Sequence, residues 1–145
     1  MNDIILSSLL NLFALFNTQN KVDKETTRKV LSNYLVHHFG VRDLDYSLEF
    51  YNDLLTFYGE MPDLDVEMFV NGICSKLHGK ISVEEQILML LRLMEIHRCG
   101  EQETTYGQAF RCVAECFDIS NDTFNDLVAF VTEDFTASRH VRMMP

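Results

Sequence analysis

Two stretches of the chain, KETTRKVLSNYLVHHFG (24–40) and QETTYGQAFRCVAECFD (102–118), share the tripeptide Glu-Thr-Thr followed by an apolar segment that ends in Phe before a turn. Their first residues, Lys24 and Gln102, are 78 positions apart. In both stretches the apolar residues recur every three or four positions, which is the spacing of one face of an α-helix. The stretches therefore predict two similar amphipathic helices.

The same offset, applied without a gap, aligns apolar positions on both sides of these stretches. It pairs Gly40-Val41 with Asp118-Ile119, and the aligned apolar pairs are Leu10 with Leu88, Leu12 with Leu90, Leu15 with Leu93, Phe39 with Phe117 and Tyr46 with Phe124. Any two amphipathic helices align to some degree, and few of the paired residues are identical. An ungapped match over roughly 50 residues nevertheless favours an internal repeat of helix, turn, helix, turn, helix. We predict one domain over 1–136, built from pseudo-duplicated three-helix units.

Hydrophobic spacing predicts helices along nearly the whole chain and no half-buried strand, so the fold class is all-α with about seven helices. The first helix is apolar nearly all round and should lie at the centre of the domain. The expected helices are Asp3–Asn17, Asp23–Phe39, Leu44–Tyr58, Val66–Leu77, Ser82–Met94, Tyr106–Phe117 and Phe124–Phe135.

Residues typical of helix ends support these segments. Asp23 and either Ser120 or Asn121 are suitable N-caps, and Ser82 with Glu85 has the spacing of a capping box. Glycines end several helices, namely Gly40, Gly59 and Gly79. Over 137–145 the apolar period disappears while Arg139, His140 and Arg142 gather, so we expect a linker or tail that leads to a downstream domain.

Composition narrows the class of partner. The 145 residues are 47% hydrophobic and 23% charged, with a net charge of −10. The apolar and charged fractions are typical of a soluble globular domain. Phosphate backbones and anionic lipids are repelled on average by this charge, so we expect no nucleic-acid partner and contact with a membrane only indirectly, through a parent transporter.

The N-terminal uncharged run, Ile4–Phe16, is 13 residues long and too short to cross a bilayer as a helix, which needs about 20 residues. No basic residue precedes it, so it does not have the pattern of a signal peptide and we expect a cytoplasmic location. The four cysteines are too sparse for a disulfide framework, and we expect reduced thiols.

Two groups of residues could carry chemistry. The stretch DLDVE (63–67) begins like a calcium loop, but Met68 replaces the required glycine and Cys74 the final glutamate, so helix-start charges are the better interpretation. A zinc site or thiol redox chemistry would use His97, Cys99, Cys112 and Cys116, whose spacing matches no zinc motif.

Ordinary packing also accounts for the remaining candidates. We expect Cys116 to flank the core and Cys112 to lie at its edge. Of His37 and His38, one should be packed and the other solvated. The tyrosines on helical faces, Tyr34, Tyr51 and Tyr58, should lie in the core. We therefore assign no catalytic, cofactor-binding or metal-binding residue.

The chain resembles the TerB-like (tellurite-resistance TerB) family of all-helical domains. The resemblance rests on an apolar helix running through a short turn into a second helix, as in LFALFNTQNKVDKETTRKVL (12–31) and LRLMEIHRCGEQETTYGQAF (91–110). Two further segments are similar to TerB-like domains at the N-terminus of bacterial ATP-binding cassette proteins, namely ICSKLHGKISVEEQILMLLRLMEI (73–96) and FDISNDTFNDL (117–127).

The turns depart from the Asp-Gly pattern of the family. The first has Asn17, Gln19 and Asn20, and the second has Cys99-Gly100. The carboxylates that remain around them are Asp23, Glu25, Glu101 and Glu103. A divalent cation such as calcium takes six to eight oxygen ligands, which two carboxylates per turn satisfy poorly. The metal site that the resemblance implies is therefore not expected here.

The resemblance implies a non-catalytic interaction or regulatory module that acts on a protein partner or a downstream domain of the same chain, as the N-terminal domain of an ATP-binding cassette protein. Two alternatives stay open at this point. One is a stand-alone metal-responsive stress protein of the TerB type, and the other is a cysteine-based redox enzyme.

Overall fold

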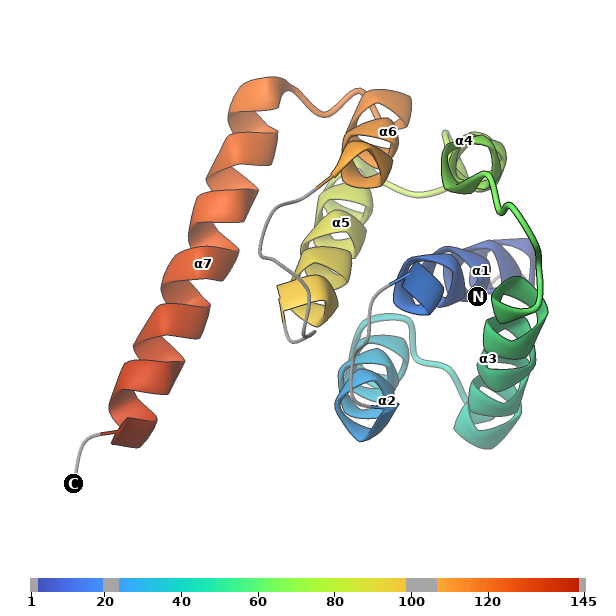
Figure 1. Ribbon diagram of the computed structural model, residues 1–145, viewed down its shortest axis with the longest axis horizontal. Coiled ribbons are helices and arrows are strands. Elements are labelled where there is room, and N and C mark those ends of the chain that lie inside the picture. The colour runs from blue at the N-terminus through green and yellow to red at the C-terminus, as the bar shows by residue number, and fades with distance from the viewer. Residues whose placement is uncertain (1–2, 20–23, 99–106, 144–145) are drawn as a thin grey trace.

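The computed structural model describes residues 3–19, 24–98 and 107–143, with side chains over 4–18, 24–98 and 107–132. Within these ranges the chain contains seven α-helices and one π-helical turn, η1, and no strand, which confirms the all-α prediction (Figure 1). The elements are α1 (Asp3–Gln19), α2 (Lys24–Asn33), η1 (Tyr34–His38), α3 (Leu44–Gly59), α4 (Val66–Leu77), α5 (Val83–Arg98), α6 (Gln108–Cys116) and α7 (Asn121–Met143).

Helix α1 lies at the centre of the domain, as predicted. It contacts α3, α4 and α5 (Figure 1). From Ser8 to Phe16 every side chain except the half-buried Asn11 is buried. A helix that is apolar on all sides needs neighbours on several of them, because each exposed apolar face would lose its contribution to folding.

The other helices contact either α1 or one another. Helix α4 packs on α1 and α6, α5 packs on α7, and α2 lies against both α3 and α5. Buried side chains from all seven α-helices form a single core cluster. The described residues therefore form one packed unit, and the surfaces considered below lie on its outside or in hollows between its helices.

Several predicted helix ends are confirmed in detail. Ser82 Oγ accepts from the Glu85 backbone N–H at 3.1 Å, and Glu85 Oε1 accepts from the Ser82 N–H at 3.2 Å, which is a reciprocal capping box. Ser120 Oγ accepts from the Thr123 N–H at 3.2 Å at the start of α7. Gly40 has φ +63° directly after the second helical segment, a conformation that favours glycine. The predicted cap Asp23 lies outside the described residues.

The second predicted helix is not one continuous α-helix, because its end widens into η1. In a π-helix residues five positions apart stack, and Phe39 accordingly lies against Tyr34 with 5.0 Å between the ring centroids. The neighbouring His38 ring also contacts Tyr34, with 5.5 Å between the ring centroids. The wider turn brings Phe39 to the core, and both His37 and His38 are exposed, which corrects the expectation that one of them is packed.

Helix α7 extends further than the sequence predicted. Its backbone remains helical to Met143, so most of the segment expected as a linker, 137–145, continues the last helix. Whether this segment leads to a downstream domain stays a prediction.

The 78-position offset agrees with the structure at some positions and not at others. Leu12 and Leu90 are both fully buried, as are Leu15 and Leu93. Leu10 is buried while its counterpart Leu88 is half-buried, and Tyr46 is exposed while Phe124 is buried. An internal duplication therefore stays a prediction.

Candidate functional site

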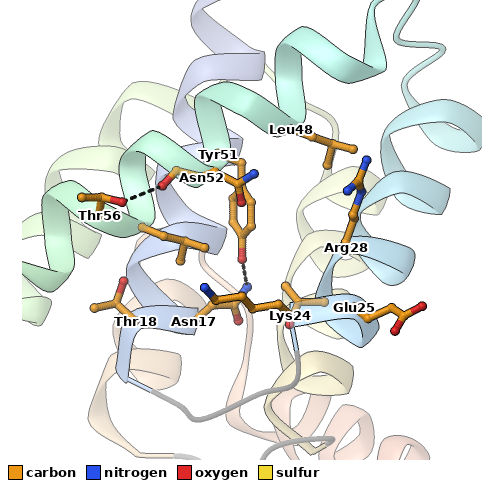
Figure 2. A pocket seen from close by; sticks show the side chains of 11 residues that line it. Asn17, Thr18, Lys24, Glu25, Arg28, Leu48, Tyr51, Asn52 and Thr56 are labelled. Carbon is orange, nitrogen blue, oxygen red and sulfur yellow. Dashed lines mark hydrogen bonds between the residues drawn. The ribbon is translucent and has the colours of Figure 1, made fainter.

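A groove of about 940 Å³ lies where the end of α1, the start of α2 and the middle of α3 meet (Figure 2). We call it the α1–α3 groove. Its lining residues are Asn17, Thr18, Lys24, Glu25, Thr27, Arg28, Leu48, Tyr51, Asn52, Leu55 and Thr56. The sequence analysis singled out Asn17 and Glu25 as parts of the first turn, but it gave no indication that α3 forms the opposite wall.

A part-buried hydrogen bond joins two residues that line the α1–α3 groove. Asn17 Nδ2 donates to Tyr51 Oη at 2.6 Å, and Figure 2 shows Tyr51 reaching from α3 toward Asn17. A second bond of the same kind lies further along the two helices, where Tyr58 Oη donates to Asn11 Oδ1 at 2.6 Å. The earlier residue of α1, Asn11, pairs with the later tyrosine of α3, and Asn17 pairs with the earlier one, so α1 and α3 are antiparallel. Tyr51 and Tyr58 are buried, as predicted, but the sequence did not identify their polar partners on α1.

The outer wall of the groove is basic. Lys24 and Arg28 are exposed and one helical turn apart on α2, while the Glu25 side chain points away from Tyr51 (Figure 2). Asn17 and Tyr51 are engaged with each other, so the groups left to meet a ligand are these two cations and the rim side chains Asn52 and Thr56. The groove is therefore suited to contact with polar or acidic groups.

We expect the stability of the fold to decrease between pH 10 and pH 12. Burial raises the pKa of Tyr51 to about 12, and the hydrogen bond from Asn17 opposes this only partly. In the unfolded chain the Tyr51 phenol ionises near pH 10. Tyr51 therefore contributes its full stabilisation to the folded state below pH 10, and this stabilisation is lost as the pH rises through the pKa of the folded state. The loss from this residue is about 2–3 kcal/mol at pH 12, measured by urea unfolding at a series of pH values.

Two variants make this test specific to Tyr51. Tyr51→Phe should flatten the alkaline part of the profile, whereas Tyr46→Phe, at a tyrosine that is 67% exposed, should leave it unchanged. Burial also raises the pKa values of Tyr34 and Tyr58, so a residual slope is expected in Tyr51→Phe. An identical slope in the wild type and Tyr51→Phe would contradict the prediction.

The cysteines lie differently from what the sequence predicted. Cys112 is buried and Cys116 is half-buried, the reverse of the expected order. Cys74 on α4 is also buried, and all three are free thiols. Burial raises the pKa of Cys74, with the nearby Cys116 adding to it, and burial likewise raises the pKa of Cys112. Both thiols are therefore held in the protonated form, which is the less nucleophilic one.

Asp65 serves as a helix cap, as the helix-start interpretation predicted. Its Oδ1 accepts from the Met68 N–H at 3.1 Å at the start of α4. Asp63 is exposed in the preceding turn. In the part of the chain that the structure describes, no group of three or more His, Cys, Asp or Glu residues could hold a metal ion. Cys99, Asp23, Glu101 and Glu103 lie outside that part.

The outward face of α3 is unusually apolar for a helix surface. Tyr46, Phe50, Leu54 and Phe57 follow one another at i, i+4, i+8 and i+11, so they form one stripe, which we call the aromatic stripe. Tyr46 is 67% and Phe57 54% exposed, while Phe50 and Leu54 are half-buried. Helical spacing places these four residues on one face, but the sequence could not tell which neighbour covers them.

An acidic row runs next to the aromatic stripe. It consists of Asp45, Glu49, Asp53 and Glu60, all of them exposed. None of these four carboxylates takes part in an ion pair with a described residue. The surface of α3 thus combines apolar side chains with an uncompensated negative charge.

Comparison with known proteins returns no matching family model, no matching curated protein and no matching solved structure. Among the described residues, no helix is both long enough and apolar enough to cross a membrane.

Proposed function

We propose that this chain is a non-catalytic interaction or regulatory module of the TerB-like kind, and that it binds a protein partner on the outward face of α3. The observation that carries the proposal is the aromatic stripe beside the acidic row. The resemblance to the N-terminal domains of bacterial ATP-binding cassette proteins favours the same class of function.

The aromatic stripe supplies the apolar part of such a contact. Large apolar side chains at i, i+4, i+8 and i+11 form one face of a helix, the kind of surface onto which an amphipathic helix packs. Tyr46 and Phe57 each leave more than half of their surface in water, so covering them releases hydration water and stabilises a complex. Aromatic residues are also enriched at the centres of protein interfaces.

The acidic row specifies the charge of the partner. Asp45, Glu49, Asp53 and Glu60 lack ion-pair partners among the described residues, and the whole chain carries a net charge of −10. A segment rich in Lys or Arg beside an apolar face would complement both rows at once, and long-range attraction would speed its association. The partner element is therefore a basic amphipathic helix.

A synthetic helix tests this surface directly. The probe is a fluorescently labelled peptide of Leu on one face and Lys on the other, and its affinity is measured by fluorescence anisotropy at low and high salt. We expect saturable binding that weakens as salt rises, because salt screens the acidic row. Phe57→Asp should weaken binding at least tenfold by placing a charge within the aromatic stripe.

The controls distinguish this surface from general stickiness. Phe130 on α7 is 55% exposed, almost the same as Phe57, so Phe130→Asp should change the affinity less than twofold. A peptide in which Glu replaces every Lys should not bind. Equal losses in the two variants, or equal binding of the acidic peptide, would contradict the proposal.

One form of the proposal is that this domain is the N-terminal part of an ATP-binding cassette protein. This form predicts that the reading frame continues beyond Pro145 into an ATP-binding cassette. A natural chain that stops at Pro145 would remove this form and leave the α3 surface to be tested on its own.

A further inference from the structure

A second hollow, of about 520 Å³, lies between η1 and α5. We call it the π pocket. Its polar lining comes from both elements and from the end of α2, namely Asn33, Tyr34, His37, His38, Arg92 and Glu95. It is separate from the α3 surface, and the inference below goes beyond the proposed function.

The inner wall of the π pocket contains a polar group without a partner. Tyr34 is only 3% exposed, and its hydroxyl makes no hydrogen bond with a described residue. Its ring is fixed between Phe13 and Phe39, at centroid distances of 5.7 and 5.0 Å, so the hydroxyl is not free to swing out to solvent. A buried hydroxyl without a hydrogen bond is destabilising, which indicates that something outside the described chain satisfies it.

Two charged residues of α5, Glu85 and Arg92, act on the Tyr34 hydroxyl. Burial and the Glu85 carboxylate raise the pKa of the Tyr34 hydroxyl, and Arg92 acts in the opposite direction. Both charged residues belong to α5, so the hydroxyl lies within electrostatic reach of that helix. With its pKa raised the phenol stays protonated at neutral pH and is available as a hydrogen-bond donor.

Arg92 provides a second donor in the same hollow. Its Nη1 donates to both carboxylate oxygens of Glu95, at 2.7 and 2.6 Å. Its Nε and Nη2 have no acceptor among the described residues, and the side chain remains about one-third exposed. The Nε and Nη2 edge of a guanidinium matches two oxygens of a carboxylate or phosphate, which it can bind through two parallel hydrogen bonds.

The π-helical turn adds the rim of the pocket. Short π-helical segments inside helices occur frequently at functional sites, because the wider turn moves side chains out of α-helical register. Here it brings Phe39 against Tyr34 and leaves His37 and His38 exposed at the opening. The amide of Asn33 and the two imidazoles are further hydrogen-bonding groups around the same opening.

We propose that the π pocket binds a small molecule through its carboxylate or phosphate group, with the Tyr34 hydroxyl and the free edge of Arg92 as the donors. The anionic group lies between η1 and α5. The rest of the molecule extends past Asn33 and the histidines toward solvent.

Nuclear magnetic resonance titration of the full chain tests this site with inorganic phosphate and succinate as separate probes and sodium chloride at matched ionic strength as a control. We expect saturable shifts of backbone amides in 30–38 and 88–95 with at least one probe. Arg92→Gln should weaken binding at least tenfold. Tyr34→Phe should weaken it about three- to tenfold while keeping the ring packing.

A matched control and the choice of probes make each result decisive. Arg28→Gln removes an exposed arginine from the α1–α3 groove and should leave the affinity unchanged. Binding of phosphate alone, of succinate alone or of both supports the site and identifies the acid group. No saturable shift with either probe at 50 mM overturns the proposal, as do shifts outside these ranges or equal losses in Arg28→Gln and Arg92→Gln. If Arg92→Gln does not fold, Tyr34→Phe alone decides the outcome.

Discussion

Replacing Phe13 by alanine should lower the free energy of unfolding by about 3–5 kcal/mol, the range observed when a buried Phe is truncated. Phe13 is fully buried in the middle of α1, the helix that contacts α3, α4 and α5. Truncation removes apolar contacts and leaves a cavity that a core with several neighbouring helices refills only in part. It also removes the ring that packs on Tyr34 at 5.7 Å. Urea unfolding followed by circular dichroism measures the change.

The control for Phe13 is a phenylalanine at the surface. Phe57→Ala, at a side chain that is 54% exposed, should change the free energy of unfolding by less than about 1 kcal/mol. Its folded state should then be available for the binding experiments on the α3 face. Similar losses in Phe13→Ala and Phe57→Ala would contradict the central placement of α1.

Leu90→Ala should lower the free energy of unfolding by about 2–5 kcal/mol, because it removes a fully buried leucine from α5. Helix α5 contacts α1 and α7, so it links the first and second halves of the chain. We expect the unfolding transition to remain single, with fluorescence and circular dichroism giving the same midpoint, because one core cluster includes all seven helices.

Leu88→Ala is the matched control for Leu90→Ala. Leu88 lies on the same helix but is only half-buried, so the expected loss is about 1 kcal/mol. A larger loss for Leu88→Ala than for Leu90→Ala would mean that the burial pattern of α5 is wrong. Two separate transitions in Leu90→Ala would instead mean that the halves of the chain fold independently.

The helices could be predicted because their signals are local. The apolar positions of α4, for example, recur at helical spacing within twelve residues, and Asp65 precedes them as a cap. The capping box of Ser82 and Glu85 is likewise complete within four consecutive residues. Such patterns act within one or two turns of the helix and need no knowledge of its neighbours.

The candidate sites could not be predicted in the same way, because each of them depends on which helices meet. Asn17 and Tyr51 are separated by 34 positions, and only the antiparallel packing of α1 on α3 brings them within 2.6 Å. The π pocket likewise depends on the approach of η1 to α5. The widening at η1 was also not predicted, because helical periodicity indicated one continuous helix over Asp23–Phe39.

By itself, the sequence determined the all-α class, the central place of α1 and most of the helix ends in the described residues, because helical periodicity and capping are properties of short segments. The tertiary structure alone decided which apolar faces were covered and which polar groups met. It left the aromatic stripe of α3 in solvent and the Tyr34 hydroxyl without a partner among the described residues. The physical reason is that burial is a property of pairs of elements, and one helix carries no information about the distance and angle at which another packs against it.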